Sequence, residues 1–222
     1  MVIKEKDLAQ TLEEQTPIPR GVLPMMLTAT EKPPHDHEHW ISEPKWNGVR
    51  AIAYIDGSQI KIKTKEDREI GGNFPELTRG FRQLSRRHSL ILDGEIIYKD
   101  GKEDSSRKMV VSRINANEAK AQMASRVAPC SYIAFDVIFA DGQDLRGRPL
   151  RERKKVLSKV LPKRFQDETN IASTFLERRN HGLLVEVAKR EHFEGVVFKR
   201  SGSSYHGGRR SREWLKLKFN AR

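Results

Sequence analysis

The chain of 222 residues is 36% hydrophobic and 32% charged, and its formal net charge is +12. This length suits one large domain or two small ones. The charge favours a polyanionic partner over an anionic membrane, since no amphipathic basic helix stands out. The single cysteine, Cys130, excludes an internal disulfide framework and a cysteine-based zinc site. Residues 1–20 contain no apolar stretch, so we expect no signal peptide or membrane span there, and a cytoplasmic protein.

Residues 1–22 are expected to be a polar lead-in with a short helical pattern around Leu8 and Leu12. Beyond them, apolar alternation predicts strands and apolar residues at helical spacing predict helices. The expected strands are residues 40–45, 49–55, 59–64, 90–98, 132–139, 195–199 and 214–219. The expected helices are residues 74–85, 107–123, 150–161 and 181–190. Helix 150–161 is expected to turn its arginines and lysines outward, and residues 201–212 to form a mobile basic loop.

Residues 43–50 read Glu-Pro-Lys-Trp-Asn-Gly-Val-Arg. Proline keeps the residue before it extended, and Asn-Gly accepts positive φ, so we expect a hairpin reversal into the next strand. Lys45 would then lie at a rigid bend, facing whatever the strands enclose, which suits a lysine nucleophile. An exposed hairpin with a merely solvated lysine is the alternative.

Charged residues recur within otherwise apolar strand segments, namely residues 92–97, 135–138, 194–199 and 214–218. Burying a charge is costly unless it is paired or used. Because side chains alternate along a strand, Lys216 and Lys218 share one face, with Leu215 and Leu217 on the other. One such segment would be an ordinary half-exposed strand. Together they predict a polar cavity lined by sheets.

These residues resemble the covalent nucleotidyltransferases, which are ATP-dependent DNA ligases, RNA ligases and mRNA capping enzymes. Lys45-Trp46-Asn47-Gly48-Val49-Arg50 is similar to their K-x-D-G-x-R signature, and the four charged segments match the later motifs in order. Residues 73–77, 135–152 and 204–211 look like the ligase module of bacterial end-joining DNA ligases. The resemblance spans residues 23–219, nearly the whole chain.

The resemblance implies an α+β nucleotidyltransferase (ATP-grasp-like) domain in which two antiparallel sheets, flanked by helices, hold ATP between them. Residues 23–222 would be this adenylation domain. The family's OB-fold domain, which orients the pyrophosphate and wraps DNA, is not expected in this chain. A separate OB-fold domain or an end-joining protein would then be a partner.

By the same resemblance, Lys45 would attack the α-phosphate of ATP to give lysyl-AMP. The attacking amine must be deprotonated, although a free lysine has a pKa near 10.4. One cation at about 4 Å in an effective dielectric of ~20 contributes ~4 kcal/mol, or roughly three pKa units. Lys216, Lys218 and a bound divalent ion are the expected cations, and they would also neutralise charge on the α-phosphate.

The remaining roles that the resemblance implies concern the nucleotide and the metal. Arg50 and Glu95 would hold the ribose, Phe135 would stack on adenine, Glu43 lies where the family recognises the base edge, Lys65 lies near its ribose-contacting arginine, and Lys199 would contact a phosphate. Glu194, with Glu95, would bind Mg²⁺ or Mn²⁺ through oxygen ligands. For Asp93 and Asp136, structural pairing and direct catalysis remain open.

Two departures from the family pattern stand out. Asn47 replaces the usual aspartate, which keeps the shape and removes a negative charge beside Lys45. It also slightly favours an RNA ligase. Residues 64–67, Thr-Lys-Glu-Asp, depart from the usual S-R-x-G and weaken the assignment of Lys65.

The sequence therefore predicts an ATP-dependent DNA ligase domain that acts as a cytoplasmic, nucleoid-associated monomer on nicked double-stranded DNA, without membrane partners. An RNA ligase, a GTP-using capping enzyme and a non-catalytic DNA-end-binding module are the alternatives. The motif runs favour the DNA ligase. Retention of the charged motif residues, which would be costly without a use, argues against the binding module.

Overall fold

The computed structural model describes residues 17–98 and 103–219. The helical pattern expected around Leu8 and Leu12 lies outside these residues. Within the described ranges, no helix has the length and apolar character needed to cross a membrane.

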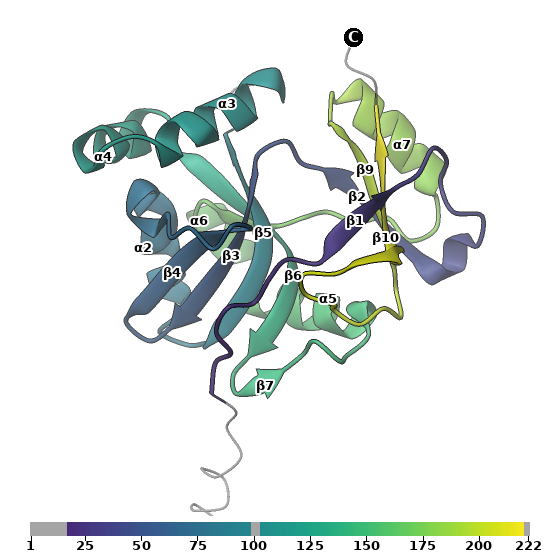
Figure 1. The fold of residues 1–222 in the computed structure, drawn as a ribbon, viewed down its shortest axis with the longest axis horizontal. Coiled ribbons are helices and arrows are strands. Elements are labelled where there is room, and N and C mark those ends of the chain that lie inside the picture. Colours follow the sequence, from purple (N-terminus) through teal and green to yellow (C-terminus); the bar gives the residue numbers. More distant parts are fainter. Residues whose placement is uncertain (1–16, 99–102, 220–222) are drawn as a thin grey trace, which may run out of the picture.

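The elements are named in chain order, as drawn in Figure 1. The strands are β1 (Met26–Ala29), β2 (Trp40–Lys45), β3 (Val49–Asp56), β4 (Gln59–Thr64), β5 (Leu90–Tyr98), β6 (Cys130–Ala140), β7 (Gln143–Asp144), β8 (Ile171–Ser173), β9 (Gly195–Arg200) and β10 (Arg210–Lys218). The α-helices are α2 (Pro75–Leu84), α3 (Glu103–Ile114), α4 (Glu118–Val127), α5 (Leu150–Val160), α6 (Lys163–Glu168) and α7 (His181–Arg190). Two short 3₁₀ turns are η1 (His37–His39) and η2 (Gly71–Asn73).

The strands form two sheets (Figure 1). The four-stranded sheet has the order β1-β10-β9-β2, and the six-stranded sheet has the order β4-β3-β5-β6-β7 with β8 beside β6. Most neighbours are antiparallel, as expected, but β1 is parallel to β10 and β8 is parallel to β6. The expected α+β class with two sheets and flanking helices is confirmed, with these two parallel pairs added.

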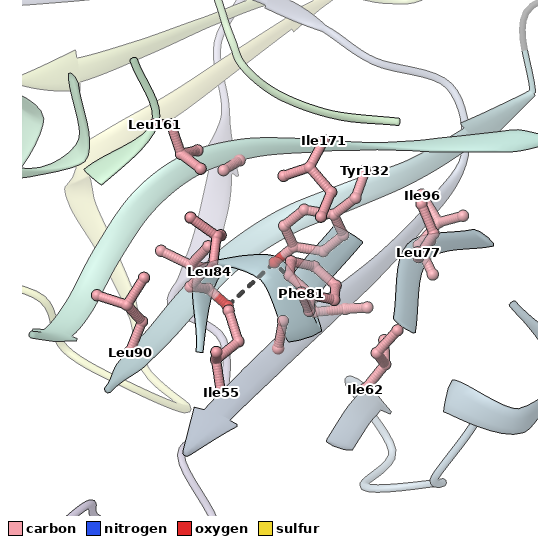
Figure 2. Packing of buried hydrophobic residues seen from close by; sticks show 14 of the residues in the cluster. Ile55, Ile62, Leu77, Phe81, Leu84, Leu90, Ile96, Tyr132, Leu161 and Ile171 are labelled. Atoms are coloured by element: carbon pink, nitrogen blue, oxygen red, sulfur yellow. Dashed lines mark hydrogen bonds between the residues drawn. The ribbon is translucent and has the colours of Figure 1, made fainter. Parts of the chain in front are cut away.

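The six-stranded sheet packs its outer face against α2, which is amphipathic. Leu77, Phe81 and Leu84 are fully or nearly fully buried and point at the sheet, because residues three and four apart share one face of a helix. Figure 2 shows this cluster, in which the rings of Phe81 and Tyr132 meet edge to face with centroids 5.2 Å apart. The Tyr132 hydroxyl is 3.0 Å from the backbone oxygen of Leu92, which satisfies a polar atom in this core.

Alternation along the strands leaves the opposite face of each sheet for the space between them. In the four-stranded sheet, Trp40, Val196 and Phe198 pack beneath α7, so their neighbours along the strands point toward the six-stranded sheet. In the six-stranded sheet, Ala51 and Ala53 belong to the outer core, whereas Ile52 packs in the cluster between the sheets. Charged residues next to the outward-facing positions of each strand therefore point into the space between the sheets.

The expected hairpin at Asn47-Gly48 is wrong. Strands β2 and β3 belong to different sheets, so Trp46–Gly48 is a crossing between sheets and not a turn within one. Gly48 does not have a positive φ. Instead, a Cβ there would lie 2.0 Å from the carbonyl oxygen of Ile96, so glycine permits the close approach of two backbones.

Three further expectations are corrected. The helix expected over residues 107–123 is two helices, because the Asn117 side chain caps α4 by accepting from the Lys120 amide. The loop expected over residues 201–212 ends where β10 begins, and it buries Ser203 and Tyr205. Helix α5 does not turn all of its cations outward, since Arg153 and Lys154 are buried.

Candidate active site

Cross-strand register brings the expected lysines together on the inner face of the four-stranded sheet. Residues directly opposite each other in antiparallel strands share a face. Lys45 and Lys218 both lie opposite Gly195, and Glu43 and Lys216 both lie opposite Val197. A Cβ at residue 195 would lie 2.0 Å from the Leu217 carbonyl oxygen, so glycine lets β9 and β10 approach closely here.

The six-stranded sheet supplies the opposite wall. Arg50 of β3 lies directly across from Glu95 of β5. Strand β6 shifts register between Ala134 and Asp136, which leaves Phe135 as an extra residue at a β-bulge. Bulges re-aim side chains near functional sites. A single cavity between the walls is lined by Leu27, Glu43, Pro44, Lys45, Trp46, Arg50, Glu95, Phe135, Val197, Lys199 and Trp214.

The expected nucleophile is held in an ion pair. The Nζ of Lys45 donates to Oε2 of Glu194 at 2.5 Å, and the Nζ of Lys218 lies 2.8 Å from Oε1 of the same carboxylate. Burial alone would raise the pKa of Glu194, but the hydrogen bonds from Lys218 and Lys45 outweigh it and hold that pKa below its usual value. Burial, followed by the ammonium groups of Lys218 and Lys45, lowers the pKa of Lys216. The structure thus gathers the three expected lysines around one carboxylate.

Deeper in the cavity, Glu43 is almost fully buried between two lysines. The Nζ of Lys199 donates to Oε2 of Glu43 at 2.8 Å, and Lys154 forms an ion pair with Oε1. Burial lowers the pKa of Lys199 to about 8. Its ammonium lies 4.3 Å from the ring centroids of both Phe135 and Trp214, within cation–π distance. Lys199, which was expected to contact a phosphate, is therefore paired with Glu43, which was expected to recognise the base.

Sequence reasoning missed Lys154. Its Nζ also donates to the backbone carbonyl of Phe135 at 2.6 Å. Lys154 therefore ties Glu43, from one sheet, to the bulge that carries Phe135 in the other. One signal in the sequence could have found it. Lys154 and its neighbour Arg153 lie at positions of α5 that share a face with apolar residues, whereas solvated cations would lie on the opposite face.

Arg50 is anchored on the other wall. It donates to both oxygens of the fully buried Asp93 at 3.0 and 2.6 Å, and to the Met25 carbonyl at 2.7 Å. The Tyr205 hydroxyl adds a 2.7 Å hydrogen bond to Asp93. The guanidinium carbon of Arg50 lies 5.2 Å from the centroid of the Phe135 ring. Asp93 thus orients the arginine, which answers the open question about this aspartate in favour of structural pairing.

Asp136 has the same kind of partner. Arg153 donates to its two oxygens at 2.9 and 2.8 Å, and both side chains are fully buried. Arg153 also donates to the Ser203 carbonyl at 2.9 Å, which fixes the loop before β10. This pair is structural, and the sequence showed neither its arginine nor Tyr205.

Glu95 differs from the paired carboxylates. Within the described residues its carboxylate has no hydrogen-bond or ion-pair partner. Burial raises its pKa to about 7, although the cations of Lys45 and Arg50 act in the opposite direction. Unlike Glu95, Lys65 lies outside the cavity lining, with 57% of its side chain exposed and Glu66 as its ion-pair partner at 3.4 Å.

A metal ion would find few protein ligands here. No group of three or more His, Cys, Asp or Glu side chains suited to a metal occurs in the described part of the chain. Glu95 and Glu194 are carboxylates from facing walls, and the pKa of Glu95 responds to the charge of Glu194. Mg²⁺ usually binds one or two carboxylates, keeps several waters and takes substrate phosphates as further ligands, so this donor set fits it.

Comparison with known proteins gives one consistent group. The family model described as ATP dependent DNA ligase domain matches residues 24–218. The SPbeta prophage-derived DNA ligase-like protein LigB of Bacillus subtilis is 31% identical over 196 residues, which cover 88% of this chain and 67% of that protein. The multifunctional non-homologous end joining protein LigD of Pseudomonas aeruginosa is 30% identical over 208 residues. That match covers 94% of this chain but 23% of LigD.

Among solved structures, a mycobacterial DNA ligase D complexed with ATP and MES superposes with a TM-score of 0.70 at 23% identity. The match covers 89% of this chain and 60% of that chain. The two share a fold. This chain therefore spans only part of the length of the proteins it resembles.

Proposed function

Because this chain belongs to the family of ATP-dependent DNA ligase domains, we propose that it is an adenylation domain that forms lysyl-AMP on Lys45 and passes the AMP to a 5′-phosphate of nicked DNA. The observation that carries this proposal is the position of Lys45. Its ammonium lies against Glu194 and beside Lys216 and Lys218, at the cavity that Arg50, Glu95 and Phe135 line. A merely solvated lysine would have no reason to share such a site.

In the first step, the deprotonated Nζ of Lys45 attacks the α-phosphorus of ATP. The N–P bond forms as the bond from phosphorus to the bridging oxygen breaks, and pyrophosphate leaves with that electron pair. Before this attack the ammonium of Lys45 must pass one proton to solvent, because an ammonium has no free electron pair, and its 2.5 Å contact with Glu194 opens as it does so. Lys218 already holds the other oxygen of Glu194, so the carboxylate keeps a cationic partner when Lys45 leaves.

The cavity suits an adenine nucleotide. Phe135 offers a ring for stacking, and Glu43 offers carboxylate oxygens to the exocyclic amine of the base. Arg50 and Glu95, opposite each other on β3 and β5, would hold the ribose. Glu194 and Glu95 would hold Mg²⁺, which when bound supplies positive charge against the charge that develops on the α-phosphate.

In the later steps, an oxygen of the DNA 5′-phosphate displaces Lys45 from AMP. The neighbouring 3′-hydroxyl then attacks the activated phosphate, so that the phosphodiester forms and AMP leaves. The arginines at positions 209, 210 and 212 support phosphate contacts near this site. A separate OB-fold domain or an end-joining protein would complete the activity of a cytoplasmic, nucleoid-associated monomer, and the end-joining name of LigD supports this partner class.

The test is intact-mass spectrometry after incubation with ATP and Mg²⁺, with GTP and NAD⁺ in parallel. Wild type should gain one AMP from ATP alone, Lys45→Ala should gain none, and Lys163→Ala, at an exposed ion pair on α6, should behave as wild type. A pre-adenylated nick in DNA and one in RNA then identify the acceptor. Absence of the adduct together with failure to seal either nick would refute the proposal and favour a non-catalytic end-binding module.

A further inference from the structure

On the side of the six-stranded sheet away from the cavity, the solvent face of α2 and the turn after it carry four arginines. Arg79 and Arg82 lie in α2, three residues apart and therefore adjacent on the helix surface, and Arg86 and Arg87 lie in the turn. All four are exposed. We propose that this α2 arginine patch binds the phosphate backbone of a duplex DNA segment other than the one presented at the cavity.

The charges on α2 are segregated by sign. Its one acid, Glu76, is turned into the core, where Arg113 donates to it at 3.2 Å and the Cys130 amide at 2.9 Å. Among the described residues, no carboxylate forms an ion pair with any arginine of the patch. The helix dipole is an alternative reason for cations near the C-terminus of α2. That effect is confined to the last turn, so it does not explain four arginines without an acid among them.

The exposed cations of helix α6 have local acid partners, in contrast to those of the patch. Lys163 forms an ion pair with Asp167, and Arg164 lies 2.9 Å from Glu168, each four residues along the helix. Such pairs satisfy the cations locally, whereas adjacent like charges are destabilising. The patch therefore keeps its charge available to an external polyanion, and regularly spaced phosphates match a row of guanidinium groups.

The position of the patch decides which DNA it binds. The buried face of α2 packs on the outer face of the six-stranded sheet (Figure 1). Its exposed arginines therefore lie on the side away from the cavity between the sheets. A domain of this length has a radius of gyration of about 17 Å. Duplex DNA has a persistence length of about 500 Å, so a nick at the cavity and an arginine contact behind the sheet require two duplex segments and not one wrapped duplex.

Bridging of two duplexes tests this inference, which rests on the proposed function only for the choice of DNA as partner. One duplex is fixed to beads, and recruitment of a second, labelled duplex by the full chain is measured. R79A/R82A/R86A is compared with K163A/R164A/R190A, which removes the same charge from cations that have local acids. All six positions are exposed, so thermal melting should show both variants folded.

We expect the patch variant to lose bridging at least tenfold and the control to keep it. The slope of log affinity against log salt for intact duplex should fall by about 3 in the patch variant, at about 0.9 per lost phosphate contact. Equal losses in both variants would mean that only net charge matters, and retained bridging in the patch variant would overturn the inference directly. Lysyl-AMP formation, measured in parallel, reports on the proposed function separately, since the patch lies behind the sheet.

Discussion

The two walls of the cavity hold their carboxylates in different ways. In the six-stranded sheet, Asp93 and Asp136 are fully buried, and each is gripped through both oxygens by one arginine. At the four-stranded sheet, Glu43 and Glu194 are each shared between two lysines.

This difference follows from the chemistry of the cations. A guanidinium presents a planar fork that matches a carboxylate in one geometry, whereas an ammonium is a point charge on a flexible stem. Arginine–aspartate pairs therefore fix a backbone, and lysine–glutamate contacts can exchange when a ligand enters. One wall is thus built to keep its shape and the other to change partners. Four variants test that division.

The largest effect is expected at the rigid wall. Arg153→Met leaves Asp136 buried without its cation, which should lower the free energy of unfolding by about 3–5 kcal/mol. A domain of this kind has only about 5–15 kcal/mol in total, so much of its stability would be lost. Urea unfolding measures the change. The matched control is Arg151→Met on the exposed side of α5, and a similar loss in both variants would contradict the structural role of the pair.

A smaller loss is expected one hydrogen bond further along the same wall. Tyr205→Phe removes the 2.7 Å bond to Asp93, which is buried and keeps Arg50 as its other partner. The Met25 amide also loses its acceptor, at 3.1 Å. We expect about 1–3 kcal/mol less stability at an unchanged m-value in urea. A variant as stable as wild type would show that Tyr205 does not help to position Arg50.

At the exchangeable wall, the expected effect is on ATP and not on folding. Lys154→Met keeps the length of the side chain but releases Glu43 and the Phe135 carbonyl. The KM for ATP in lysyl-AMP formation should rise roughly tenfold, about 1.4 kcal/mol, with kcat little changed. Lys154→Arg should restore part of the loss. Lys155→Met, the exposed neighbour, should match wild type, and an equal effect there would exclude a specific clamp.

Much of this architecture could be predicted from local sequence. The bounds of β2, β4, β5 and α7 match those expected, because apolar periodicity and turn residues act over a few positions. The cavity-lining residues that were expected from the family resemblance are Glu43, Lys45, Arg50, Glu95, Phe135 and Lys199. Lys65 was expected there as well, yet it is exposed outside the lining.

What could not be predicted depends on contacts between distant segments. The parallel pairing of β1 with β10 joins residues far apart in the chain and leaves no local pattern. Asn47-Gly48 has the composition of a hairpin turn, but the next strand, β3, belongs to the other sheet, so this segment crosses between the sheets. Lys154 looked solvated because its partner Glu43 is more than a hundred residues away. Asn117 was missed as a helix cap because an asparagine within a helical pattern is locally tolerated.

Glu95 gives the most diagnostic effect, because in the part of the chain that the structure describes it is the cavity carboxylate without a fixed partner. Its folded pKa of about 7 lies above its ordinary value of 4.5, so the folded state binds the proton more tightly than the unfolded state. Its contribution to stability is therefore complete below about pH 4.5 and is lost as the pH rises through 7.

Glu95→Gln cannot ionise, so its Tm relative to wild type should rise as the pH increases from 4.5 to 8. The rise of the pKa from 4.5 to about 7 corresponds to roughly 3 kcal/mol, at about 1.4 kcal/mol per pKa unit, and each kcal/mol corresponds to about 2–4 °C in Tm for a chain of this size. Thermal melts of both proteins across this range, with Glu66→Gln at an exposed ion pair as control, measure the difference. A Tm difference that does not depend on pH would show that Glu95 is already ionised and paired, and would place it with the rigid wall. The alternative result is a Tm difference that grows with pH and becomes smaller at pH 8 when added Mg²⁺ raises the Tm of wild type. That result would show that this carboxylate is kept unpartnered for a cation that arrives with the nucleotide.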